Sequence, residues 1–208
     1  MAAAREAFPA WRDLPAPRRA EILFRAAELL QKAKAELGKN VTREMGKVYA
    51  EGMGDIQEAI DMAYYMAGEG RRLVGETVPC ELPNKDGKSI RVPHGVFALI
   101  TPWNFPVAIP VWKIFAALVC GNTAVFKPSS DSPVRRAAGG NPRGSRVAAR
   151  SVESGYGAGP AGWQVSGLHP EVDGISFTGS CAVGEELAGR PPNCIVPSPW
   201  KWGARTRF

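Results

Sequence analysis

Two short apolar runs on either side of a helical stretch constrain the fold of this chain more than any other feature. VFALITP occupies residues 96–102, NTAVFKP occupies residues 122–128, and PVAIPVWKIFAALVCG lies between them. Apolar runs of this length are typical of strands that are buried on both faces of a parallel sheet. Strand, helix and strand within about thirty residues form a βαβ unit, so the sequence predicts an α/β fold with a parallel sheet.

The residues before this unit predict a helical layer. Apolar residues recur at helical spacing over residues 17–37, and Gly38 is expected to end that helix. Residues 40–72 predict one or two further helices, with Gly52 and Gly54 as a break.

After the helical layer, the sequence changes to short extended pieces. ETVPCELP and KSIRVPHG flank the turn residues NKDG at residues 84–87, a pattern that indicates a hairpin or a pair of arm strands. We therefore predict four regions, which are helices at 1–77, an extended arm at 78–94, the sheet region at 95–188 and a tail at 189–208.

Two segments account for the basic excess and look least like folded protein. Residues 134–168 hold five arginines against one glutamate, and residues 189–208 hold four basic residues and no acidic one. Residues 134–168 hold almost no large apolar residues, and both segments are predicted to be disordered linkers. A nucleic-acid-binding function rests only on these scattered charges, without aromatic platforms or a known module, and is the weakest interpretation.

The rest of the sequence indicates the compartment and the partners to expect. No run of eighteen apolar residues occurs, and the charged pair Arg5–Glu6 interrupts the region where a secretion signal needs an apolar core. The four cysteines form no CxxC pair and have no metal-ligand spacing. We therefore expect a cytoplasmic protein with free thiols, no metal site and no membrane partner.

Three motifs in a fixed order give the chain a resemblance to a known family. ITPWNFP at residues 100–106 is followed by GNTAVFKPSSDSP at residues 121–133 and by ISFTGSCAVG at residues 175–184. This sequence resembles the aldehyde dehydrogenase superfamily over residues 3–133 and 169–188. The resemblance implies a partial aldehyde-dehydrogenase-like fold with a Rossmann-like sheet, NAD or NADP as cofactor, a small-molecule aldehyde as substrate and a homo-oligomeric family.

The resemblance also implies roles for individual residues. Asn104 matches the amide that donates to the oxyanion of the intermediate, and Pro102 and Pro106 stiffen the turn around it. Lys127 matches the lysine that reaches the adenosine ribose, and the Gly179–Ser180 turn matches the one that meets the pyrophosphate. The full set predicted to bind the cofactor is Ile100, Thr101, Pro102, Trp103, Lys127, Ser130, Gly179, Ser180 and Gly184.

One departure from the family pattern concerns the choice of cofactor. Ser130 stands where members that prefer NAD commonly have a glutamate, so a 2′-phosphate is not repelled and NADP is expected to be tolerated. Cys181 replaces a usual threonine on the cofactor side, and we do not expect it to be the nucleophile. His94 and His169 are expected to be surface residues without a ligand role.

A second departure concerns the catalytic groups. The family's general-base glutamate and nucleophilic cysteine have no counterpart in these 208 residues, and the catalytic domain is absent from them. We hypothesise a truncated dehydrogenase in which residues 134–168 and 189–208 are out-of-frame segments. The expectation is an NAD(P)-dependent oxidoreductase by descent that is inactive as this chain. The alternative is a non-catalytic remnant that binds cofactor or pairs with intact subunits.

Overall fold

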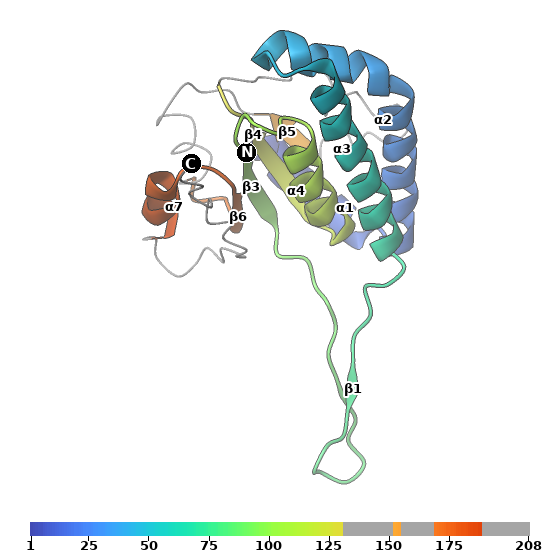
Figure 1. The fold of residues 1–208 in the computed structure, drawn as a ribbon. Helices are drawn as coiled ribbons and strands as arrows, with labels where there is room; N and C mark the ends of the chain where they lie inside the picture. Colours follow the sequence, from blue (N-terminus) through green and yellow to red (C-terminus); the bar gives the residue numbers. More distant parts are fainter. Residues whose placement is uncertain (131–151, 155–168, 189–208) are drawn as a thin grey trace, which may run out of the picture.

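The computed structural model describes residues 1–130, 152–154 and 169–188, and these form helices around a parallel sheet with one projecting arm (Figure 1). The helices are α1 (Ala2–Asp13), α2 (Ala16–Met45), α3 (Tyr49–Glu69), α4 (Ala108–Val119) and α7 (Cys181–Ala188). The strands are β1 (Thr77–Val78), β2 (Gly87–Lys88), β3 (Val96–Ile100), β4 (Thr123–Lys127), β5 (Val152–Ser154) and β6 (Gly174–Phe177). The predicted α/β class with a parallel sheet and a helical layer is confirmed.

The sheet has the order β5-β4-β3-β6, and every neighbouring pair is parallel. β3 therefore lies inside the sheet, and all five of its residues are buried, as are all five of β4. Burial on both faces explains why β3 and the centre of β4, residues 124–126, are apolar without alternation. β5 falls inside the segment for which the sequence predicted no strand, so that prediction is wrong for residues 152–154. The rest of that segment and the 189–208 tail lie outside the described residues.

One face of the sheet is covered by a thick helical layer. Phe97, Leu99 and Phe126 point into a core that also holds the buried faces of α2, α3 and α4. The prediction that Gly38 ends the first long helix is wrong, because α2 continues to Met45. A Cβ built on Gly52 would lie 3.0 Å from the carbonyl oxygen of Gly38, so the two glycines let α2 and α3 approach closely inside regular helices.

Both side chains that cap the carboxyl end of α4 come from the N-terminal helices. Trp11 Nε1 donates to the carbonyl oxygen of Leu118 at 3.0 Å, and Arg19 Nε donates to that of Val119 at 3.0 Å. Carbonyl groups at a helix end have no partner within the helix, and these bonds supply donors to two of them. The carbonyl oxygen of Leu118 also accepts the N–H of Gly121 at 2.9 Å. The sequence predicted helices over residues 1–77 but gave no separate bounds for α1, which contains Pro9 and places Trp11 at 0% exposure.

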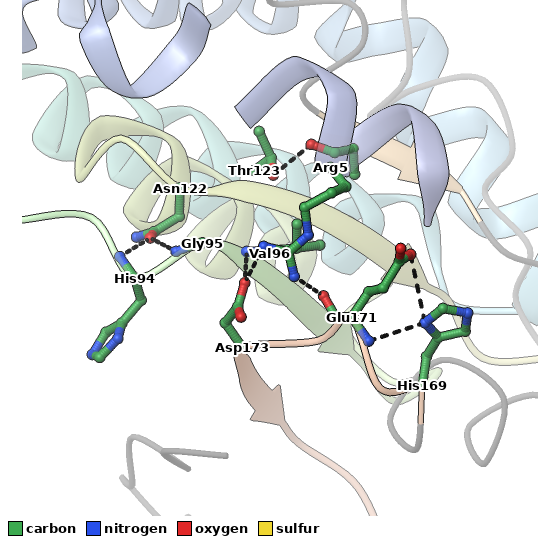
Figure 2. A network of polar contacts seen from close by, with 10 residues as sticks. Arg5, His94, Gly95, Val96, Asn122, Thr123, His169, Glu171 and Asp173 are labelled. Atoms are coloured by element: carbon green, nitrogen blue, oxygen red, sulfur yellow. Dashed lines mark hydrogen bonds and ion pairs between the residues drawn. The ribbon is translucent and has the colours of Figure 1, made fainter. Parts of the chain in front are cut away.

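The opposite face of the sheet is covered more thinly, by α1 and α7. Ala4 packs on Val96 and Val125, and Leu187 packs near Ile100 and Ile175. At the amino ends of the strands, a polar network joins distant parts of the chain (Figure 2). Its central link is Asp173, whose carboxylate pairs with Arg5 at 2.8 Å and accepts a hydrogen bond from the N–H of Val96 at 2.8 Å.

The same network contains a side-chain acceptor before β4. Asn122 Oδ1 accepts hydrogen bonds from the N–H groups of His94 at 2.7 Å and Gly95 at 3.0 Å, so it fixes the entry into β3 (Figure 2). Gly95 has φ +145°, a backbone conformation that other residues rarely adopt. The ring of His169 lies 3.8 Å from the Glu171 carboxylate, on the outside of this network.

The arm projects from the body as a long hairpin (Figure 1). β1 and β2 pair in antiparallel fashion, with Thr77 opposite Lys88 and Val78 opposite Gly87. Apolar side chains of the arm are exposed, among them Leu82 at 62%, Ile90 at 71% and Val92 at 71%. The predicted pair of arm strands is therefore present, with its apolar side chains uncovered within the described chain.

Candidate functional site

The Asn104 turn connects the buried strand β3 to α4. Thr101 is buried, whereas Trp103 is 52% exposed and Asn104 is exposed, so the chain leaves the core within three residues of the strand end. Pro102 and Pro106 fix their own φ angles on either side of this pair. The turn thus presents an amide side chain at the edge of the sheet on a backbone with few alternatives.

Two charged side chains of the helical layer contact this turn. Lys47 Nζ donates to the main-chain carbonyl oxygen of Asn104 at 2.7 Å. Asp55, at 0% exposure, accepts hydrogen bonds from the N–H groups of Val107 at 3.3 Å and Ala108 at 3.0 Å. Burial raises the pKa of the Asp55 carboxyl, and the bonds from Ala108 and Val107 partly offset that rise.

Sequence reasoning missed both residues, although a signal for one was present. Asp55 lies on the buried face of α3, between Gly52 and Ile56, where a carboxylate is costly unless it is hydrogen-bonded. An acidic residue on the apolar face of a predicted helix indicates a buried partner. Its partner lies 52 residues away along the chain, which a periodic pattern does not reveal.

The carboxyl ends of β4, β3 and β6 lie side by side. Ile100 pairs with Lys127 on β4 and with Phe177 on β6. The N–H of Thr101 donates to the carbonyl oxygen of Lys127 at 3.3 Å, and that of Thr178 donates to Ile100 at 3.0 Å. The turns that follow all three strands therefore begin at one edge of the sheet, and they carry the residues that the sequence singled out.

The connections from β3 and β6 leave this edge toward opposite faces. β3 leads to α4, which packs on the face of Leu99 and Phe126, whereas β6 leads to α7, whose Leu187 packs on the face of Ile100. Adjacent parallel strands whose helices depart to opposite faces open a crevice between them, where open α/β sheets bind their ligands. The two predicted groups of site residues flank that point.

The glycine–serine turn stands at the start of α7. Gly179 and Ser180 are exposed, and Ser180 precedes the first helical residue, Cys181. Free N–H groups and the helix dipole at such a position favour an anion. Gly184 differs from these residues because it is buried and its N–H donates to the carbonyl oxygen of Ser180 at 3.0 Å. Gly184 therefore supports the helix turn and does not present a free N–H.

Lys127 and Ser130 lie after β4 on the same edge. Lys127 is 8% exposed, so its side chain is enclosed over most of its length, whereas Ser130 is exposed. The residues at this edge suit a phosphorylated dinucleotide, since a cationic side chain and an exposed helix N-terminus can both face anionic oxygens.

A second lysine near this edge, Lys113, has a lowered pKa. Lys113 of α4 donates from Nζ to the hydroxyl of Ser176 on β6 at 2.8 Å. Desolvation lowers the pKa of Lys113 to about 8. Sequence reasoning assigned Lys113 no role, because the spacing of α4 does not show that this residue reaches β6.

Several other features of the described chain are neutral toward function. No group of three or more histidine, cysteine or acidic residues there is placed to hold a metal ion, and none of the helices described is long and apolar enough to cross a membrane. Cys80, Cys120 and Cys181 are free thiols. Cys194 lies outside the described residues.

Comparison with known proteins gives consistent matches. The sequence model of the aldehyde dehydrogenase family matches residues 1–196. The chain is 38% identical over 194 residues to alpha-ketoglutaric semialdehyde dehydrogenase of Bacillus subtilis (strain 168), covering 89% of this chain and 38% of that enzyme. The chain thus spans well under half the length of this curated relative.

Solved structures show the same similarity. A crystal structure of an NAD-dependent benzaldehyde dehydrogenase from Corynebacterium glutamicum matches with a TM-score of 0.79 at 32% identity, covering 88% of this chain and 40% of that one. A crystal structure of an E. coli NADP-dependent enzyme matches with a TM-score of 0.78 at 34% identity, covering 89% and 39%. One neighbour is described as NAD-dependent and the other as NADP-dependent.

Proposed function

The chain belongs to the aldehyde dehydrogenase family, and from this premise we propose that its sheet edge is the cofactor-binding part of an enzyme that oxidises aldehydes to carboxylic acids with NAD or NADP. The observation that carries the proposal is the pair of strand ends β3 and β6. They are adjacent, they send their helices to opposite faces, and they carry the Asn104 turn and the Gly179–Ser180 turn.

Within this proposal, each turn has a separate task. The exposed N–H groups at the start of α7 would hold the pyrophosphate, and Lys127 would hold the adenosine ribose. Trp103 and the residues Ile100–Pro102 would line the cleft beside the sheet. A bound nicotinamide would supply the acceptor for the hydride of the substrate.

The Asn104 side chain would serve the aldehyde itself. Oxidation through a covalent thiol adduct develops negative charge on the former carbonyl oxygen, and a fixed amide N–H stabilises that charge with little reorganisation. Asn104 suits this task because its side chain is exposed while its main-chain carbonyl is held by Lys47 at 2.7 Å. We assign no nucleophile and no general base among the 208 residues.

Titration calorimetry with NAD⁺ and NADP⁺ tests the cofactor part of the proposal. The chain is expected to bind both, and Lys127→Met is expected to weaken both by roughly ten- to a hundredfold, because a hydrogen bond to a charged group contributes about 1.5–3 kcal/mol. Ser130→Glu is expected to weaken NADP⁺ selectively, because the carboxylate repels a 2′-phosphate. Equal binding by all three proteins would overturn this assignment of the edge.

An absorbance assay for reduced cofactor tests the catalytic part. With a panel of aliphatic aldehydes and semialdehydes, a polypeptide of these 208 residues is expected to form no reduced nicotinamide. The reason is that the proposal assigns no residue in it as the nucleophile or the general base. Sustained turnover that disappears on alkylation of Cys181 or Cys194 would show that one of these thiols is the nucleophile.

The second candidate function is non-catalytic binding or subunit pairing, and the arm favours it. Leu82, Ile90 and Val92 are more than half exposed on a hairpin that extends from the body (Figure 1). Apolar side chains in that position suit a protein partner. A cytoplasmic location, a homo-oligomer and an absence of nucleic-acid partners complete the proposal, and sedimentation of the chain with and without Ile90→Asp tests the role of the arm.

A further inference from the structure

Charged side chains from outside the sheet form hydrogen bonds with both ends of the Asn104 turn. We propose that Lys47 and Asp55 are positioning residues that set the orientation of the Asn104 turn. This inference rests on the proposed role of Asn104 as the oxyanion donor, and it deepens that role by naming what holds the donor in place.

Lys47 holds the beginning of the turn. It lies in the three-residue link between α2 and α3, directly after Gly46, whose φ of 71° turns the chain at the end of α2. Its ammonium group lies 2.7 Å from the Asn104 carbonyl oxygen and 4.0 Å from the centroid of the Phe105 ring. One cation therefore fixes a main-chain oxygen and covers the next side chain, a cation–π contact.

Asp55 holds the end of the turn. Its two carboxylate oxygens accept the N–H groups of Val107 and Ala108, which are the last residue before α4 and the first residue within it. These N–H groups have no acceptor within the helix, and α4 has no side-chain cap of its own at this end. Asp55 therefore caps α4 from another helix and determines where the helix begins.

Together the two contacts bracket the residues between Asn104 and Ala108. The bond from Lys47 uses the main-chain carbonyl of Asn104, so the side-chain amide remains available for another partner. A donor is effective when its support fixes it before the charge develops. Removing either contact leaves the turn attached at one end, which allows the amide to reorient.

The two positioning residues also act on one another electrostatically. Lys47 and Glu58 are the charged groups that affect the Asp55 carboxyl, the first favouring its ionised form and the second opposing it. A change of charge at Asp55 should therefore be visible at the turn that it supports, in addition to any change in overall stability.

Heteronuclear NMR of the whole chain tests the proposal without cofactor or aldehyde. The measured quantities are the side-chain amide signal of Asn104 and the exchange rates of the Val107 and Ala108 amides. Asp55→Asn should raise both exchange rates by about tenfold or more, because Asn offers one acceptor oxygen where the carboxylate offers two. Lys47→Met should shift and broaden the Asn104 side-chain signal, and Lys47→Arg should restore it.

The matched controls are Lys39→Met and Asp86→Asn, which change exposed residues of the same types away from the turn. Neither control should move the Asn104 signal. A pH titration adds a readout that stability alone does not produce. The Asn104 side-chain signal should titrate with a midpoint above the ordinary Asp value, should lose this titration in Asp55→Asn, and should titrate at higher pH in Lys47→Met.

Two results would overturn the proposal. One is an Asn104 signal that is unchanged in Lys47→Met. Because Lys47 is only half-buried, this variant can be measured even when Asp55→Asn fails to fold. The other is an Asn104 titration that persists in Asp55→Asn. Failure of the proposed function is separate, because cofactor binding and turnover are measured independently, and the coupling within the turn is expected whether or not Asn104 meets an oxyanion.

Discussion

The two faces of the sheet differ in how they are covered. On one face, Leu99 and Phe126 belong to a single large core with α2, α3 and α4. On the other face, Ala98 and Val125 belong to two small clusters that involve α7 and α1 separately. Lys47 and Asp55, from the thick helical layer, bind the Asn104 turn, whereas the glycine–serine turn at the start of α7 is exposed. Both turns are exposed, and within the described residues only the Asn104 turn is bound by side chains of the thick layer.

A matched pair of isoleucine truncations tests this difference with the largest effect. Ile60 of α3 is 1% exposed in the large core, and Ile175 of β6 is 0% exposed in a small cluster. Ile60→Ala is expected to lower the free energy of unfolding by about 3–4 kcal/mol, and Ile175→Ala by about 2 kcal/mol, because a thin cluster can collapse around the cavity. Denaturant melts measure both, and an equal or larger cost at Ile175 would contradict the comparison.

Lys113 tests the contact between α4, on the thick face, and β6, at the end of the described strand order. Its pKa is lowered from 10.5 to about 8, so between these values the unfolded chain binds more protons than the native one. Stability should therefore rise as pH increases from about 8 toward 10, by on the order of 2 kcal/mol, and Lys113→Met should remove that rise. Urea melts at pH 7.5 and 9.5 measure it. A wild-type slope that survives in Lys113→Met would assign it to another group.

How far the sequence predicts this architecture depends on the range of the contacts involved. β3 and β4 are predictable, because burial on both faces requires continuous apolar runs. The end of α2 at Gly46, beyond Gly38, is not predictable, because Gly38 is retained in the helix by its close contact with Gly52 of α3. Local propensity favours ending the helix at Gly38, and tertiary packing overrides it.

The candidate site divides in the same way. The Asn104 turn follows from prolines and an amide that are neighbours in sequence, so pattern and resemblance both identify it. Lys47 and Asp55 lie 57 and 52 residues from the groups they bind, and only folding brings them there. Gly184 was predicted to bind the cofactor from its motif, but its burial and helical hydrogen bond show that proximity in a motif does not fix exposure.

Trp11 tests how α1 links the two faces. Its indole N–H donates to Leu118 at the end of α4, while Ala4 of the same helix packs on the thin face. Trp11→Phe should cost about 1 kcal/mol, because it removes one hydrogen bond to a carbonyl oxygen that still accepts the N–H of Gly121, and it keeps most of the apolar contact. Thermal melts measure the loss, and Phe24→Leu, at a 37% exposed position of α2, is the control with little expected change.

Arg5 gives the smallest expected effect. Its ion pair with Asp173 lies at the amino ends of the strands, with the two side chains 36% and 34% exposed (Figure 2). Arg5→Met should lower stability by about 0.5 kcal/mol, and high salt should reduce the difference, because solvent screens pairs of this exposure. A loss of several kcal/mol in urea melts would mean that the thin face depends on this network far more than its exposure indicates.

The claim that the dinucleotide binds at the carboxyl edge of the sheet is tested most directly by a map of backbone amide signals during titration with NADP⁺. The largest shifts are expected at Gly179, Ser180 and Lys127, with smaller shifts at Trp103 and none at Gly87 in the arm. Such a pattern would place the dinucleotide at the carboxyl edge of the sheet, across β3, β4 and β6. Saturable shifts confined to the arm or to the amino ends of the strands would contradict the claim.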